Sequence, residues 1–276
     1  MKISKRKLHK YKEISVGLIL VAIVLFCAVF APLITEYDPQ EIAVMQRLQP
    51  PGNGHIWGTD HFGRDLFSRV IYGTRISMIV AVSVLIVCGI VGTFLGLISG
   101  YYKRLDSIIM RILDGIRAFP SILLALVILA ALGPGLGNIV IALSISYIPN
   151  VARTVRSSVL AVKEFEHVQS ARAVGAKDYY ILLRYIFPLC ISPLIVRLTL
   201  VMGLTILSES TLTFLGVGIS PSIPSWGNIL SEGKLYMTTS PWVTIYPGIA
   251  IVATVLGVNL LGDGLRDLLD PRLSNS

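Results

Sequence analysis

The chain has 276 residues, of which 54% are hydrophobic and only 14% are charged, and its mean hydropathy is +0.73. A soluble domain carries about 25% charged residues and has no core that could hide so much apolar surface. The composition therefore excludes an ordinary soluble enzyme and a disordered chain. Because the apolar stretches are long runs rather than short alternating strands, a transmembrane barrel is also disfavoured. The predicted fold class is an all-α membrane protein.

The first element is an apolar run close to the start of the chain. Residues 14–34 carry no charge and are long enough for a helix that crosses the hydrocarbon core, which takes about 20 residues. The basic stretch 1–13 resembles the start of a signal peptide, but the apolar run is longer than such peptides have, and Pro32 follows directly on the Val29–Ala31 segment, a loose cleavage sequence. We interpret it as a retained anchor, followed by an extracytoplasmic loop at 35–75.

Five further spans are predicted in a permease core at 76–263. They cover residues 76–102, 107–132, 138–157, 187–215 and 242–262. The third and fourth separate at the glycine- and proline-rich segment 133–138, which is typical of a turn.

Lysine and arginine set the orientation of the six helices. With both termini in the cytoplasm, most basic residues lie on the inner side, as the positive-inside rule requires. The tails 1–13 and 264–276 are then cytoplasmic. The net charge of +8 thus reflects topology and does not indicate a nucleic-acid partner.

The residues that usually carry enzyme chemistry are sparse. Cys27, Cys88 and Cys190 each lie in an apolar stretch and are expected to be small buried hydrophobes, without disulfide or metal. The sequence has no P-loop and no His-Glu-x-x-His motif, so we predict no catalytic residue, bound cofactor or metal in this chain.

The polar loop 160–188 is the most informative segment. Its spacing predicts a helix that ends at Gly175, since glycine adopts the left-handed conformation of a helix C-terminus. Asp178 is placed to cap a second helix over 179–187, and Pro188 marks the entry into the fifth span. Two short helices with a sharp bend would form a compact knob on the inner face.

Four segments together resemble one family. Gln169-Ser170-Ala171, Gly175 and Tyr185–Pro188 stand where the coupling loop of importer permeases has Glu-Ala-Ala, Gly and Ile-x-Leu-Pro, with departures at the first two and at the Ile and Leu positions. Segments 55–77, 209–228 and 259–272 also look like the permease subunits of dipeptide, oligopeptide and nickel ABC importers, specifically the C-type partner of a heterodimeric pair.

The resemblance implies a machine of several chains in a bacterial or archaeal cytoplasmic (inner) membrane. It would join this chain to a second homologous permease, two ABC ATPases that bind ATP and Mg, and an extracytoplasmic substrate-binding protein, in contact with membrane lipid. The substrate would be a short peptide. The residues expected to transmit the ATPase motion are Gln169, Ser170, Ala171, Ala173, Gly175, Asp178 and Pro188.

Other candidate residues keep two interpretations each. Glu209 lies about 20 residues into the fifth span and either faces the pore as a gate or pairs with arginine or hydroxyl groups of the bundle. Asp60, Arg64 and Asp65 either contact the binding protein or pair with one another in a folded cap. Trp226 is either a binding-protein contact or an interfacial anchor.

Three rival functions stay open at this stage. One alternative within the same family is the import of nickel or a metal chelate instead of a peptide. An alternative from another class of transporter is a secondary ion-coupled carrier, which the scarcity of intramembrane acids disfavours. An intramembrane enzyme lacks a nucleophile paired with a base.

Overall fold

The structure is a computed structural model that describes residues 5–52 and 54–269. These residues form helices and connecting loops, with two isolated β-bridges, Gly52–His55 and Thr59–Asp65, and no strand. The predicted all-helical class is confirmed for this part of the chain. Residues 1–4 and 270–276, parts of the two predicted tails, lie outside the described residues.

The long helices match most of the predicted spans. Their bounds are α1 (Lys5–Ile34), α2 (Leu66–Val87) continued by the π-helical η2 (Cys88–Gly92) and α3 (Thr93–Tyr101), α6 (Leu136–Val162), α9 (Phe187–Phe214) and α11 (Trp242–Leu269). Within the described chain, four stretches are long and apolar enough to cross a membrane: Ile14–Ile34, Leu66–Tyr101, Asp178–Phe214 and Trp242–Leu268. α6 is also long, but its second half carries Arg153 and Arg156 and it is not among the four.

The third predicted span is not one continuous helix. It consists of α4 (Lys103–Arg117) and α5 (Ser121–Leu132), which meet at an angle of 86° and count as a fifth span only if taken together. Pro120 explains the break, because it lacks a backbone N–H and restricts Phe119 to an extended conformation. α4 is amphipathic, whereas α5 is apolar after its first residue, Ser121.

Two other boundaries differ from the sequence-based expectation. Residues 66–75, expected in the extracytoplasmic loop, are the first turns of α2. Pro188 does not separate two helices, because α8 (Asp178–Ile181), the π-helical η3 (Leu182–Ile186) and α9 follow one another without a break. Pro188, which has no backbone N–H to donate, lies in the first turn of α9 directly after the π-helical turn, where a missing donor is tolerated.

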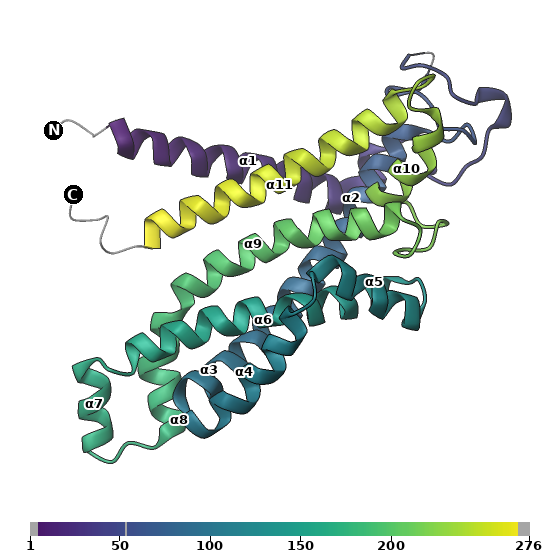
Figure 1. The fold of residues 1–276 in the computed structure, drawn as a ribbon. Helices are drawn as coiled ribbons and strands as arrows, with labels where there is room; N and C mark the ends of the chain where they lie inside the picture. Colours follow the sequence, from purple (N-terminus) through teal and green to yellow (C-terminus); the bar gives the residue numbers. More distant parts are fainter. Residues whose placement is uncertain (1–4, 53, 270–276) are drawn as a thin grey trace.

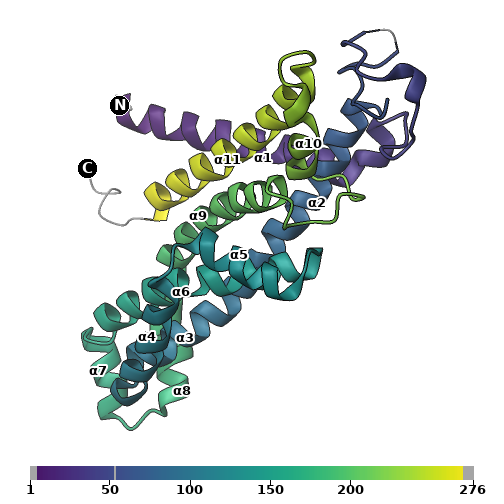
Figure 2. The ribbon, with the colours of Figure 1, turned by 45° about the vertical axis from the view of Figure 1, so that its right-hand side comes forward.

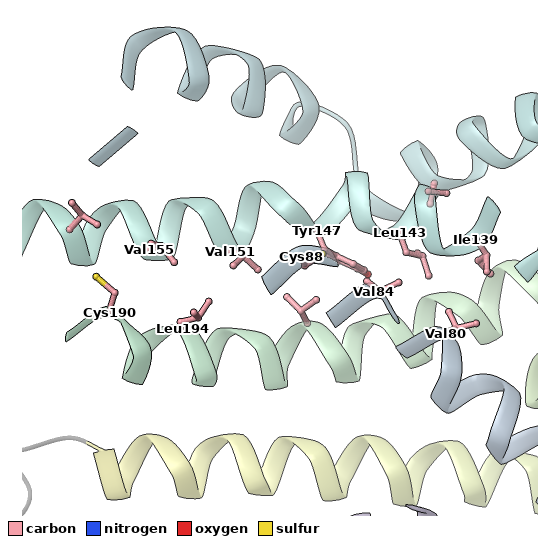
Figure 3. Packing of buried hydrophobic residues seen from close by; sticks show 14 of the residues in the cluster. Val80, Val84, Cys88, Ile139, Leu143, Tyr147, Val151, Val155, Cys190 and Leu194 are labelled. Carbon is pink, nitrogen blue, oxygen red and sulfur yellow. The ribbon is translucent and has the colours of Figure 1, made fainter. Parts of the chain in front are cut away.

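The main core lies along α6. Tyr147, Val151 and Val155 of α6 belong to one buried cluster with Cys88 of η2 and Leu194 of α9 (Figure 3). α6 also packs closely against α3.

A stripe of glycines lets α3 approach the backbone of α6. Gly92, Gly96 and Gly100 recur every fourth residue, and each faces α6. A Cβ atom at Gly96 would lie 2.6 Å from the carbonyl oxygen of Ala152 and 2.7 Å from the Cβ of Val155. Small residues at this spacing permit close helix packing in membranes.

The two ends of the molecule differ in character. α7 (Glu166–Ala173) and α8 form one end, whereas the loop 35–65 and α10 (Trp226–Gly233) form the other (Figures 1 and 2). The start of α1 lies beside the end of α11, and these two helices pack together along their length (Figure 1).

Candidate functional site

The loop between α6 and α9 has the geometry that the sequence indicates around Gly175. Gly175 has φ +83°, and its N–H donates to the carbonyl of Arg172 while the N–H of Ala176 donates to that of Ala171. These two bonds end α7 in a glycine-closed turn of the Schellman type. No other atom lies within 4 Å of the position that a Cβ at residue 175 would take. Glycine is therefore favoured at this position by the backbone conformation and not by close packing.

Asp178 has a different role from the predicted helix cap. Lys177 occupies the cap position of α8 without a side-chain hydrogen bond, and Asp178 is the first helical residue. Its Oδ1 instead accepts a hydrogen bond of 2.7 Å from the hydroxyl of Tyr101 at the end of α3. The cap prediction is therefore wrong, because the carboxylate is turned toward another helix.

Tyr101 holds both halves of the α7–α8 loop, and sequence reasoning missed it. Arg172 of α7 lies over the Tyr101 ring at 5.5 Å from its centroid, within the range of a cation–π contact. The hydroxyl of the same residue bonds to Asp178 of α8. Lys163 adds a third tie by donating to the carbonyl oxygen of Gly100 at 3.3 Å. The loop is thus fixed to the corner between α3 and α4.

The other predicted loop residues divide by exposure. Gln169, Ser170 and Ala173 are exposed, and the Gln169 amide donates to the carbonyl of Lys163. Ala171 faces inward and joins the core cluster, so its side chain offers no contact surface in this structure. Pro188 is exposed at the start of α9.

The tip of the loop is apolar. Val174 is 86% exposed, and Tyr179 and Leu183 are 63% and 61% exposed. They lie in the segment from α7 to η3, at the end of the molecule far from α10 (Figure 2).

Glu209 is buried among hydroxyl groups. It is 0% exposed, and its carboxylate accepts hydrogen bonds from Ser77 of α2 at 3.0 Å and from Thr213 at 3.1 Å, with Ser210 at 3.4 Å. No arginine or lysine of the described chain pairs with it. Of the two sequence-based interpretations, the contacts match pairing with hydroxyl groups of the bundle, and a role in a pore or gate stays a prediction.

The residues proposed to contact a binding protein form a buried ion cluster. Asp60 is 0% exposed and accepts from Arg64 at 2.7 Å and from Arg69, and both arginines also donate to Glu232 of α10. Burial alone would raise the pKa of Asp60, but Arg69, Arg64 and two backbone N–H groups hold it below its ordinary value of 3.8.

The remaining members of this predicted set are also turned inward. Asp65 does not pair with Arg64, but accepts from His55 at 2.8 Å and caps α2 through the N–H of Ser68. Trp226 is 0% exposed, and its indole N–H donates to the carbonyl of Val70 at 3.1 Å. The folded-cap interpretation therefore fits Asp60 and Arg64, while Asp65 and Trp226 have partners that the sequence did not indicate.

One group of metal-ligating residue types lies in this cap. Ligand atoms of Asp60, His61 and Glu232 fall within 4.8 Å of one another. Both carboxylates already accept from Arg64 and Arg69, so their charge is balanced by guanidinium groups and the donor set does not suit a cation.

Comparison with known proteins places the chain in a family. Residues 92–275 match the family described as binding-protein-dependent transport system inner membrane component. Residues 6–51 match the N-terminal TM domain of oligopeptide transport permease C.

Individual relatives extend over nearly the whole chain. A Brucella abortus protein is 46% identical over 271 residues, which cover 98% of this chain and 92% of that one. The dipeptide transport system permease protein of Alkalihalophilus pseudofirmus is 44% identical, with 98% and 89% covered. The glutathione transport system permease protein of Pectobacterium atrosepticum is 41% identical, with 98% and 90% covered.

A solved structure shares the fold. A chain of the methionine ABC transporter MetNI, in an inward-facing form, aligns with a TM-score of 0.60 at 17% identity and covers 73% of this chain and 96% of that chain. The family match extends over more than half of the chain, and it fits a set of long apolar helices joined by a short two-helix loop. The protein therefore belongs to the family of binding-protein-dependent transport system inner membrane components.

Proposed function

We propose that this chain is the C-type permease subunit of an ABC importer that carries short peptides across the cytoplasmic membrane. The observation that carries the proposal is the 44% identity to a dipeptide transport permease over 98% of the chain. The glutathione permease relative points to the same cargo class, because glutathione is itself a short peptide.

The proposal includes a membrane arrangement. The six spans would be α1, α2–α3, α4–α5, α6, α9 and α11, with the chain termini and the α7–α8 loop on the cytoplasmic side. The end of the molecule that contains the ion cluster of Asp60 and Glu232 would then lie on the extracytoplasmic side. The partners would be a second permease, two ATPases that hold ATP and Mg, and an extracytoplasmic binding protein, while this chain would bind no cofactor and hydrolyse nothing.

The α7–α8 loop is the part suited to receive an ATPase. Exposed apolar side chains around a rigid turn mark a protein-binding surface, and Val174 and Tyr179 supply them. The ties from Tyr101 to Arg172 and Asp178 would pass a displacement of the loop to α3 and α4.

Uptake measurements test the energy source and the cargo. In cells that express the whole transporter, labelled dipeptide should accumulate when the ion gradient is dissipated and stop accumulating when the ATPase is inactivated. Uptake that needs the gradient but not the ATPase would favour a secondary transporter and contradict the proposal. Accumulation of a nickel chelate instead of the dipeptide would move the assignment to the metal branch of the family.

A pair of glycine variants tests the loop. Gly175 and Gly133 both have positive φ, +83° and +84°, and both have open space where a Cβ would be. Alanine costs about 1–2 kcal/mol of backbone energy at a left-handed glycine, and about 1–3 kcal/mol at Gly133, whose ψ of 169° lies in a region populated essentially by glycine alone. We expect Gly175→Ala to reduce co-purification of the ATPase roughly tenfold, while Gly133→Ala, on the opposite side, leaves it unchanged. Equal effects of the two substitutions would show that the loop has no special role in ATPase binding.

A further inference from the structure

The break between α4 and α5 opens a polar cavity in the side of the helix bundle. This cavity, called the notch below, has a volume of about 360 Å³. Its main lining residues are Arg117, Pro120, Ser121, Leu124, Ser146 and Asn150. Three kinds of polar side chain and a stretch of non-helical backbone meet in the notch.

In the membrane arrangement proposed above, two helix lengths place the notch well inside the bilayer. α5 has 12 residues, so its 1.5 Å rise per residue brings the break roughly 18 Å from the turn at 133–135. Along α6, which starts beside that turn, Ser146 and Asn150 lie roughly 15–21 Å from Leu136. Both figures fall near the middle of a hydrocarbon core of about 30 Å.

The backbone at the break is not covered by this chain. Arg117, Ala118, Phe119 and Pro120 are all exposed. Non-helical backbone at membrane depth is tolerated only where protein buries it or where it lines a water-filled space, because lipid cannot hydrogen bond to it. Lipid is therefore excluded as the neighbour of the notch.

Charged groups favour water over a covering protein surface. Arg117 is exposed, and no acidic side chain in the described part of the chain pairs with it. Beside it on α4 and α6, Asp114 and Arg153 form an ion pair whose side chains are 56% and 48% exposed. Ionised side chains at this depth usually face an aqueous cavity or a transport pathway.

We propose that the notch lines the aqueous pathway through which the substrate crosses the membrane. This inference rests on the proposed function and on its membrane arrangement, and it assigns the lining to α4, α5 and the facing side of α6. The guanidinium of Arg117, the hydroxyl of Ser121 and the amide of Asn150 are groups that donate hydrogen bonds to the carboxylate and carbonyl oxygens of a peptide. The Ser146 hydroxyl is not counted among them, because it already donates to the carbonyl oxygen of Ala142.

Thiol labelling of the assembled transporter tests the assignment. Ser121→Cys and Asn150→Cys place a thiol on each side of the notch. Val252→Cys is the control, since Val252 is 57% exposed and lies ten residues into α11, at a depth similar to that of Ser146 in α6. The probe is a membrane-impermeant cationic methanethiosulfonate, added from either side of the membrane. Wild-type transporter gives the background, because Cys88 and Cys190 are buried and Cys27 is half-buried.

The expected result is faster reaction in the notch. Both notch thiols should react from at least one side about tenfold or more faster than Val252→Cys, because the reactive thiolate forms where water reaches the sulfur. Their modification should also abolish peptide uptake. Uptake by the unlabelled variants checks the proposed function separately. Notch thiols that react as slowly as the control from both sides, or whose modification leaves uptake unchanged, would overturn the proposal.

Discussion

Replacement of Gly96 by alanine tests the close packing of α3 on α6. The new Cβ would lie 2.6 Å from the carbonyl oxygen of Ala152 and 2.7 Å from the Cβ of Val155. Neither atom can rotate away, since one belongs to the backbone and the other is fixed to it. Overpacking costs about 1–3 kcal/mol, and the rigidity of these neighbours places Gly96→Ala at the upper end. The gain of about 1 kcal/mol in helix propensity offsets part of this cost, which leaves about 2 kcal/mol of destabilisation.

Gly115→Ala is the matched control for this substitution. Gly115 is also a helical glycine, in α4, but no atom lies within 4 Å of its Cβ position. The same change should therefore leave the free energy of unfolding unchanged or raise it by up to about 1 kcal/mol.

Thermal unfolding of the purified transporter in detergent, followed by intrinsic fluorescence, separates the two cases. We expect the Tm of Gly96→Ala to fall by about 4–8 °C and that of Gly115→Ala to hold or rise. The packing argument would be refuted if Gly96→Ala had the same Tm as the wild type, or if both variants lost the same number of degrees in Tm.

Three further predictions concern the polar contacts. Asp60→Asn leaves the cap with one uncompensated positive charge, so hydrogen exchange of its amides should accelerate roughly hundredfold, as expected for about 3 kcal/mol. Because the pKa of Asp60 is held below 3.8, the stabilisation it gives is present above that pH and is lost as the pH falls through the lowered pKa, which exchange measured across acidic pH would show. Glu209→Gln should lower peptide uptake without loss of complex assembly, and normal uptake would contradict a role in the pore. Tyr101→Phe removes the bond to Asp178 but keeps the ring, so uptake per ATP hydrolysed should fall while ATPase binding persists.

Local signals in the sequence account for the features that were predicted well. Apolar runs of the right length located the long helices, because burial in lipid needs little beyond hydropathy and length. Gly175 was identifiable because a positive φ strongly favours glycine. The glycine stripe and Pro120 are equally local signals, but the predicted span 107–132 runs through Pro120 and hydropathy alone does not mark the break.

Contacts between distant segments account for most of the misses. Arg69 and Glu232 lie 163 residues apart and meet at Asp60 only after α2 and α10 have packed together. Asp178 had a plausible local role as a cap, but a tertiary hydrogen bond to Tyr101 competes for the same carboxylate. Local propensity predicts what a residue can do within its own turn, whereas its partner in the fold depends on the packing of whole helices.

The contacts of Tyr101 connect the two proposals. The α7–α8 loop is tied to Tyr101, the last residue of α3, and α4 begins two positions later at Lys103. α4 is held along α6 by a bidentate pair between Asp106 and Arg156, with both bonds at 2.6 Å. Displacement of the loop by an ATPase would therefore act directly on the helix whose far end forms the notch. The 86° break separates α4 from α5, which packs on α6, so a tilt of α4 caused by a movement on the cytoplasmic side would change the width of the polar cavity at the break.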